Sequence, residues 1–217
     1  AYSLLLFYRL GDSFLTNWDE AWYGDIIRNM AEKGNLLTPI WNKEPFFDKP
    51  PLYFWFSSIS YRTFGPTEFA IRFFSALSAA GTAIVLFFLA KLLFNKKVAL
   101  ISVVVLISTV GFLYRARTGN LDVFLAFWLL FAIFSFYKGY KENRPRWYMM
   151  MGLATAMAFL TKGAIAYVFP VFAGLFLLVR KDLKQKHFWV SLLLSIATVG
   201  AWYVVSYLVN GPEFLRT

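Results

Sequence analysis

The feature that most constrains this chain is a succession of apolar runs between residues 67 and 209 that are candidates to cross a bilayer. About 20 apolar residues in a helix span the hydrocarbon core, and a helix satisfies its own backbone there. Such runs lie at 67–94, 98–113, 121–137 and 187–209. A fifth run, 147–179, is interrupted at Lys162, where we expect two short helices to meet as a hairpin. The pattern predicts an all-α polytopic membrane protein with about six transmembrane helices in 67–209.

Composition agrees with a membrane protein. Hydrophobic residues make up 59% of the 217 residues, charged residues only 16%, and mean hydropathy is +0.55, whereas soluble domains are about 25% charged. The absence of cysteine excludes a disulfide scaffold, zinc–thiolate sites and thiol catalysis. In a soluble protein the net charge of +10 would suggest nucleic acid. Here we expect the lipid bilayer as partner and no nucleic acid.

The distribution of charge predicts an orientation. The loops at 91–97, 138–146 and 180–186 together carry +9, and the remainder of the chain carries +1. Positively charged loops stay in the cytoplasm. We therefore expect a multi-pass protein of the plasma (inner) membrane. The segments 11–66, 115–122 and 210–217 and the interruption at Lys162 would share the extracytoplasmic side.

The segment 11–66 is expected to be the first extracytoplasmic loop, because prolines and charges interrupt it. Within it, 18–32 and 50–64 have the pattern of amphipathic helices, which we place at the membrane interface. Residues 1–10 are expected to be the end of a first transmembrane helix. Residues 210–217 would begin an extracytoplasmic segment at which the chain is truncated.

Polar residues gather on the predicted outer side. Asp19 and Glu20 open the first amphipathic helix, where acids also suit the positive end of the helix dipole. Asp48 and Lys49 precede the second, where an ordinary capped loop explains them equally well. Lys162 interrupts an otherwise apolar stretch, and intramembrane charges default to functional candidates with a partner.

A second polar group lies between two predicted spans. Arg115, Arg117 and Asp122 fall within eight residues, although an interfacial arginine can also simply extend its head to water. His187, the only histidine, lies on the cytoplasmic side and is expected to be an interfacial residue. The sequence has neither a GxxxxGK[ST] nor a GxGxxG motif, so a nucleotide site is not expected.

Four motifs occur in one order along the chain. They are Trp18-Asp19-Glu20-Ala21-Trp22-Tyr23, Phe47-Asp48-Lys49-Pro50-Pro51, Arg115-x-Arg117 with Asp122, and Leu160-Thr161-Lys162-Gly163. In this order they resemble the lipid-linked glycosyltransferases of the C-type (GT-C) superfamily, in the branch of aminoarabinose transferases and protein O-mannosyltransferases. The resemblance covers nearly the whole chain. Because such enzymes are much longer, it implies an N-terminal fragment.

The resemblance implies a GT-C transmembrane bundle with extracytoplasmic juxtamembrane helices, and it implies roles for single residues. Asp19 corresponds to the catalytic aspartate. The cations that would hold the donor phosphate are Lys49, Arg115, Arg117 and Lys162, and the supporting residues are Glu20, Tyr23, Asp48 and Asp122. Two positions depart from the branch: Asp48 stands where glutamate often precedes Lys-Pro-Pro, and Trp22 where an arginine often follows the acidic pair.

The function that this implies is transfer of a sugar from a polyprenyl-phosphate donor to a lipid, glycan or protein acceptor by inverting displacement. The chemistry agrees, because cations stabilise a departing phosphate and a carboxylate can accept the proton of the acceptor. No cofactor is expected, and the residues do not decide whether a divalent metal ion takes part in the reaction. The alternative is a transporter or flippase for an anionic polyprenyl lipid, which uses the same cations without catalysis.

Overall fold

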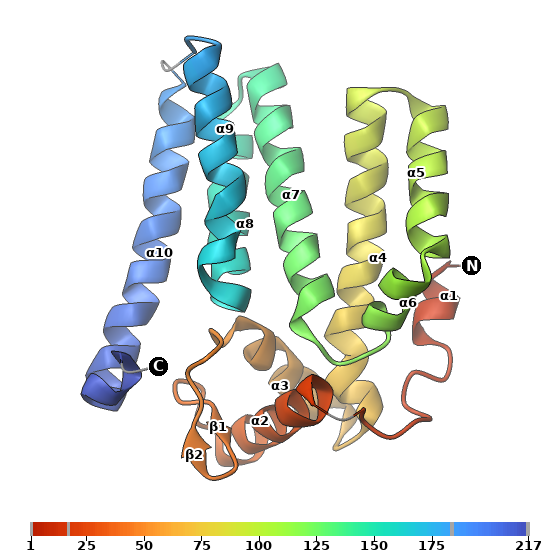
Figure 1. The fold of residues 1–217 in the computed structure, drawn as a ribbon, viewed down its shortest axis with the longest axis vertical. Helices are drawn as coiled ribbons and strands as arrows, with labels where there is room; N and C mark the ends of the chain where they lie inside the picture. Colours follow the sequence, from red (N-terminus) through yellow and green to blue (C-terminus); the bar gives the residue numbers. More distant parts are fainter. Residues whose placement is uncertain (1, 17, 183–184, 216–217) are drawn as a thin grey trace. The chain divides into compact units, whose positions relative to one another are not determined.

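The computed structural model describes residues 2–16, 18–182 and 185–215. The chain forms two compact units, one ending at Phe127 and the other beginning at Trp128 (Figure 1). Within the described residues, four helical segments are long and apolar enough to cross a membrane, and a bent helix pair would make five. These segments are Glu68–Leu93, Leu121–Glu142, Pro145–Val179 and Lys186–Leu215, with Lys96–Ser108 and Val110–Ala116 as the bent pair.

Two antiparallel helices form the membrane part of the first unit, α4 (Glu68–Leu93) and α5 (Lys96–Ser108). Each begins at a side-chain cap that satisfies a free backbone N–H. The Thr67 hydroxyl accepts from the Ala70 N–H at 3.3 Å, and the Asn95 side chain accepts from the Val98 N–H at 3.0 Å. These caps fix the starts of both helices.

The apolar run at 98–113 does not form one straight helix. It breaks at Thr109, and α6 (Val110–Ala116) is bent by 69° from α5. The hydroxyls of Ser108 and Thr109 both donate to the carbonyl of Val105, at 3.1 and 2.8 Å. Such bonds to the preceding turn compete with the helical ladder and bend helices. The bend turns α6 away from the direction of α5 before the polar Arg115–Asp122 segment begins.

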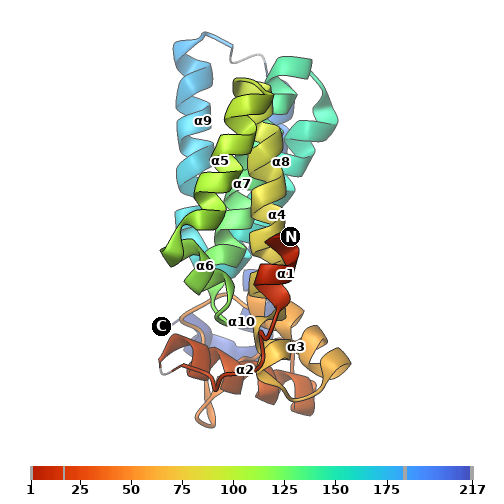
Figure 2. The same ribbon diagram turned by 90° about the vertical axis from the view of Figure 1, so that its right-hand side faces the viewer.

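The segment before α4 begins with α1 (Tyr2–Phe7) and contains α2 (Asp19–Lys33) and α3 (Leu52–Phe64). The two longer helices agree with the predicted amphipathic helices to within two residues at each end. They lie side by side across the first turns of α4 (Figures 1 and 2). Helix α2 buries Ile26, Ile27 and Met30 and ends at Gly34, whose positive φ of 72° suits glycine.

A short hairpin follows α2 and was not predicted. Its strands are β1 (Ile40–Trp41) and β2 (Glu44–Pro45), antiparallel, with Trp41 opposite Glu44. The Asn29 side-chain amide donates to the Ile40 carbonyl at 3.3 Å, and the Asn42 N–H donates to Asp25 Oδ2 at 3.5 Å. These bonds attach the hairpin to α2.

The second unit is a helical bundle. Helix α7 (Leu121–Glu142) enters it from the first unit, and α8 (Pro145–Lys162), the 3₁₀ turn η1 (Gly163–Tyr167), α9 (Val168–Val179), α10 (Lys186–Asn210) and η2 (Gly211–Leu215) follow. Met151 and Ala154 of α8 share one core with Ala173 and Leu177 of α9. The chain therefore folds back after Lys162, where the sequence analysis expects a hairpin.

Helices α8 and α10 approach closely at one glycine. A Cβ on Gly152 would lie 2.2 Å from the backbone carbonyl oxygen of Ser191, closer than any such contact in real proteins. Only glycine therefore allows the two helices this separation.

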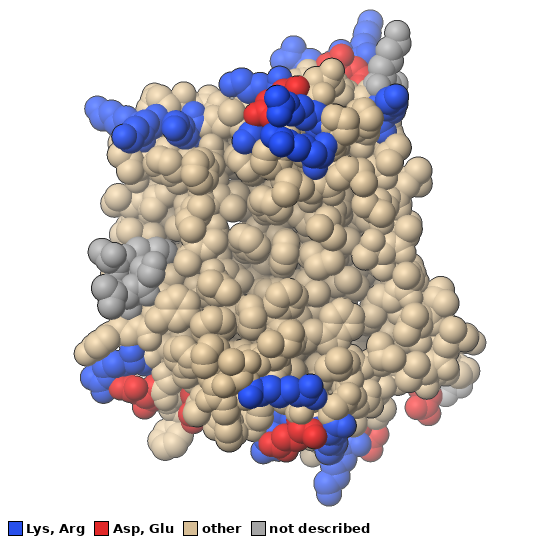
Figure 3. Space-filling view, turned by 180° about the vertical axis from the view of Figure 1, so that it is seen from behind, with Lys and Arg blue, Asp and Glu red and all other residues tan. Residues whose placement is uncertain are grey.

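In the view of Figure 3, charged side chains gather toward the ends of the helices, and the described surface between them carries no charged side chain. Within the first unit, Lys91, Lys96 and Lys97 lie at the α4–α5 turn, at the opposite end of α4 from α2 and α3. Together with the long apolar helices, this distribution is that of an integral membrane protein.

Candidate active site

The start of α2 is fixed by an ion pair that lies inside the protein. Arg72, on the first turns of α4, donates from Nε to Glu20 Oε1 at 2.7 Å and from Nη2 to Oε2 at 3.2 Å. Both side chains are only 2% exposed. The remaining Arg72 donors reach the carbonyls of Leu10, Ser13 and Phe14, each at 2.9 Å. One guanidinium thus connects α4, α2 and the segment between α1 and α2.

The Glu20 carboxylate is also held from two other directions. It accepts from the N–H of Thr16 at 2.6 Å and from its hydroxyl at 2.8 Å. The Gly119 N–H donates to it at 2.7 Å. A Cβ on Gly119 would lie 2.7 Å from Ile71, so glycine permits this approach. The Gly119 bond connects the start of α2 to the α6–α7 turn.

These contacts decide the protonation of Glu20. Burial alone would raise the pKa of its carboxyl group, but the hydrogen bonds from Arg72, Thr16 and Gly119 outweigh burial and lower it. Glu20 is therefore an ionised structural anchor whose acceptor positions are occupied.

Asp19 is the first residue of α2 and, unlike Glu20, is exposed. It lines a cavity of about 420 Å³ whose other residues come from the segment before α2, from the start of α2, from the end of α6 and from the α6–α7 turn. Arg115 also lines this cavity, and its Nη1 lies 3.7 Å from Asp122 Oδ2. Asn120 fixes the turn, since its amide donates to the Thr118 hydroxyl at 2.6 Å and its Oδ1 accepts from the Asp122 N–H at 3.0 Å.

Tyr23 lies one turn after Asp19, and its hydroxyl lies close enough to three of the predicted acidic residues to be affected by their charges. Its side chain is buried, and burial raises the pKa of its hydroxyl, with further increases from the negative charges of Asp19, Asp122 and Asp48. Three carboxylates from segments far apart in sequence thus act on the neutral hydroxyl of Tyr23. Within the described residues, however, no three histidine, cysteine or acidic side chains lie close enough to hold a metal ion.

Arg117 lies on a different cavity. Its guanidinium donates to the carbonyls of Leu5, Leu6 (3.2 Å) and Tyr8 (2.9 Å) at the end of α1. The cavity beside it has a volume of about 390 Å³ and is also lined by Arg9 and Arg72. Arg117 therefore holds the end of α1, while Arg115 faces the cavity of Asp19.

The other two predicted cations lie elsewhere. Lys49 is half-buried in the segment between the hairpin and α3, next to the exposed Asp48. Lys162 is exposed and belongs to the second unit, where it ends α8 immediately before Gly163, a residue with a φ of 77°.

A row of three tryptophans begins at the Asp19 cavity. Trp18 lines this cavity and is 74% exposed, although its backbone has a φ of 67°, which is unusual for a bulky residue. Its ring centroid lies 6.2 Å from that of Trp22, which lies 4.7 Å from that of Trp41 on the hairpin. The hairpin that sequence reasoning missed therefore supplies the third ring.

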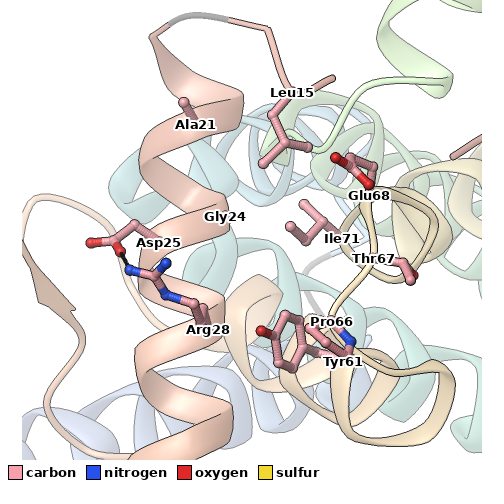
Figure 4. Close-up of a pocket in the computed structure, with 10 residues that line it drawn as sticks. All are labelled: Leu15, Ala21, Gly24, Asp25, Arg28, Tyr61, Pro66, Thr67, Glu68 and Ile71. Carbon is pink, nitrogen blue, oxygen red and sulfur yellow. Dashed lines mark hydrogen bonds and ion pairs between the residues drawn. The ribbon is translucent and has the colours of Figure 1, made fainter. Parts of the chain in front are cut away.

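A separate cavity of about 410 Å³ lies on another face of α2, between α2, the end of α3 and the first turn of α4. In Figure 4 the Asp25 carboxylate pairs with Arg28 at its rim, while Leu15 and Ile71 extend over Gly24. A Cβ on Gly24 would lie 2.7 Å from Leu15. None of the residues predicted for the site lines this cavity.

Sequence reasoning missed Arg72, the partner of Glu20. A signal for it was present, because Arg72 is a charge near the start of the apolar run 67–94. The argument that selected Lys162 applies equally to Arg72.

The long apolar helices, with α2 and α3 lying across the first turns of α4, form a membrane-protein fold of the C-type glycosyltransferase kind. Solved structures agree on this fold. ArnT from Cupriavidus metallidurans superimposes with a TM-score of 0.88 in the apo state and 0.89 bound to undecaprenyl phosphate. Both comparisons are at 24% identity and cover 97% and 98% of this chain, but only 41% of ArnT.

The chain belongs to the dolichyl-phosphate-mannose-protein mannosyltransferase family, whose sequence model matches residues 48–204. A curated but uncharacterised protein of Aquifex aeolicus is 31% identical over 98% of this chain and 44% of its own length. An undecaprenyl phosphate-alpha-4-amino-4-deoxy-L-arabinose arabinosyl transferase of Yersinia pestis is 32% identical over 75% of this chain and 30% of its own. The chain thus spans less than half the length of these relatives.

Proposed function

We propose that this chain is the N-terminal part of a membrane glycosyltransferase that takes a sugar from a polyprenyl-phosphate donor. The observation that carries the proposal is the Asp19 cavity, which two exposed residues of opposite charge, Asp19 and Arg115, line together. The buried Glu20–Arg72 pair beside it holds the start of α2 in place. A rigidly supported base next to a cation suits displacement of a phosphate leaving group.

The proposed step is a single inverting displacement. Asp19 takes the proton of the acceptor hydroxyl while the acceptor oxygen forms a bond to the anomeric carbon. The bond between that carbon and the phosphate oxygen breaks, and the polyprenyl phosphate leaves with the electron pair. Arg115 stabilises the negative charge that develops on the phosphate.

The other predicted residues have assigned roles in this proposal. Lys49, Arg117 and Lys162 add positive charge for the donor phosphate, with Arg117 acting from its place at the end of α1. Glu20, Tyr23, Asp48 and Asp122 support the site. The site would face the extracytoplasmic side of the plasma (inner) membrane, and the acceptor would be a lipid, glycan or protein.

Replacing Asp19 by asparagine tests the base. Asp19→Asn keeps the size of the side chain but removes the proton acceptor, so transfer should fall by about 10²–10⁴-fold. Binding of the donor should stay within about two-fold, because the cations are unchanged. The measurement is the transfer rate and the donor affinity of full-length protein in one detergent, with undecaprenyl phosphate-linked 4-amino-4-deoxy-L-arabinose as donor.

Asp12→Asn is the matched control. Asp12 is an exposed aspartate that pairs with Arg9 outside the Asp19 cavity, and its loss should leave both quantities unchanged. Asp25 is less suitable, since it binds the hairpin backbone. If Asp19→Asn transfers sugar at the wild-type rate, Asp19 is not the base. Movement of the lipid across the membrane without any transfer by the wild type would favour the flippase instead.

A further inference from the structure

We infer that Trp18 forms the wall of the Asp19 cavity against which the sugar ring of the donor stacks. This inference rests on the proposed function and adds to it a residue that recognises the sugar rather than the lipid phosphate. It starts from the position of Trp18, a residue that lines the same cavity as Asp19 and Arg115.

The indole is available to a ligand. Trp18 is 74% exposed although it lines a cavity of about 420 Å³. Small-molecule sites combine such aromatic walls with a few convergent polar groups. The exposed charged groups here are Asp19 and Arg115. A pyranose ring has the matching chemistry, with C–H groups on its face for the indole and hydroxyls on its edge for the polar side chains.

The Trp18 ring also has a second tryptophan ring beside it. Trp22 lies 6.2 Å from it and is itself 4.7 Å from Trp41, measured between ring centroids. The hydrogen bonds of Asn29 and Asp25 fix the hairpin that carries Trp41. A row of contacting rings loses little conformational freedom when a ligand binds, since aromatic side chains have few rotatable bonds.

The alternative role of an exposed tryptophan in a membrane protein is to anchor the chain at the bilayer interface. The two roles of Trp18 differ in one measurable respect. A stacked sugar makes Trp18 matter only for lipids that carry a sugar, whereas an interfacial anchor makes it matter equally for every lipid.

The experiment measures dissociation constants of the full-length protein in nanodiscs for two probes, undecaprenyl phosphate and undecaprenyl phosphate-linked 4-amino-4-deoxy-L-arabinose. Trp18→Ala should weaken the sugar-bearing probe about 10-fold and leave the sugar-free probe within about two-fold. Trp18→Phe, which keeps an aromatic ring, should recover most of the affinity. Trp189→Phe, at an exposed tryptophan of α10, is the control and should change neither constant.

Three results would overturn the inference. One is equal weakening of both probes by Trp18→Ala, and another is no weakening of either while the wild type binds and transfers normally. In both cases the proposed function survives. If the wild type itself binds neither probe, the proposed function fails, and the inference fails with it. Quenching of tryptophan fluorescence by brominated lipids is a second readout. The absolute decrease in fluorescence should be the same for the wild type and for Trp18→Phe. A smaller decrease in Trp18→Phe would place Trp18 in the bilayer.

Discussion

Asp19 and Glu20 are adjacent in sequence, but their carboxylates have opposite environments. Asp19 is exposed in a cavity, while Glu20 is 2% exposed and accepts bonds from Arg72, Thr16 and Gly119. A helix turns by 100° per residue, so neighbouring side chains point in different directions. The pair therefore divides into a group that can react and a group that holds the fold.

Glu20→Gln should destabilise the protein by about 3–5 kcal/mol, because it leaves the buried charge of Arg72 without its counter-ion. Thermal unfolding in detergent measures the loss. Asp12→Asn, which breaks an exposed pair with Arg9, should cost at most about 1 kcal/mol.

The stabilisation by Glu20 should also depend on pH. Its pKa in the folded protein is lowered, so its contribution is complete above the ordinary glutamate pKa of about 4.3 and is lost as the pH falls through the lower folded value. The difference in unfolding temperature between wild type and Glu20→Gln should thus be constant above about pH 5 and shrink in more acidic buffer. A difference that persists unchanged at pH 3 would contradict this linkage.

At the scale of helices, the close approach of α8 and α10 makes its own prediction. Gly152→Ala places a methyl group against the Ser191 carbonyl and should lower stability by about 1–3 kcal/mol as the helices separate. Gly200→Ala is the control within α10, since a Cβ there meets nothing within 4 Å. It should be neutral or slightly stabilising, because alanine favours helices. Unfolding temperatures of both variants check this, and an equal loss would show that the contact is unimportant.

The helices that the sequence predicts well are those defined by long apolar runs. The break at Thr109 escaped prediction because the surrounding residues are uniformly apolar, and two hydroxyls that compete for the Val105 carbonyl give no signal in hydropathy. The hairpin escaped because its two-residue loop is Asn42-Lys43, both with positive φ. Glycine is the usual second residue of such loops and lysine is not.

For the candidate site, the sequence predicts a set of residues but not their arrangement. Motif order selected Asp19 and Arg115, which line one cavity. It also selected Arg117, two residues after Arg115, whose donors face the end of α1. Spacing along the chain does not reveal which carbonyls a guanidinium will find, because that depends on contacts about 110 residues away.

For the whole molecule, charge predicts topology. A cysteine at Asn143, in the strongly positive α7–α8 loop, should react with a membrane-impermeant maleimide only from the cytoplasm. A cysteine at Asn35, just after α2, should react only from the outside. Both positions are exposed, and this chain has no cysteine to interfere. Labelling of intact cells and of inverted vesicles, with full-length protein free of other cysteines, makes the measurement. Labelling of both positions from one side would overturn the orientation.

The hydrogen bonds that Arg117 donates to the end of α1 have a consequence for biosynthesis. Its partner Leu5 precedes it by 112 residues. At a synthesis rate of about 5–20 residues per second, the end of α1 waits roughly 6–22 s before its partner has been made. During this interval the carbonyls of Leu5, Leu6 and Tyr8 lack the donor that they have in the finished protein. The end of α1 therefore gains these hydrogen bonds only after α4, α5 and α6 have been synthesised, so its final position is set late in translation.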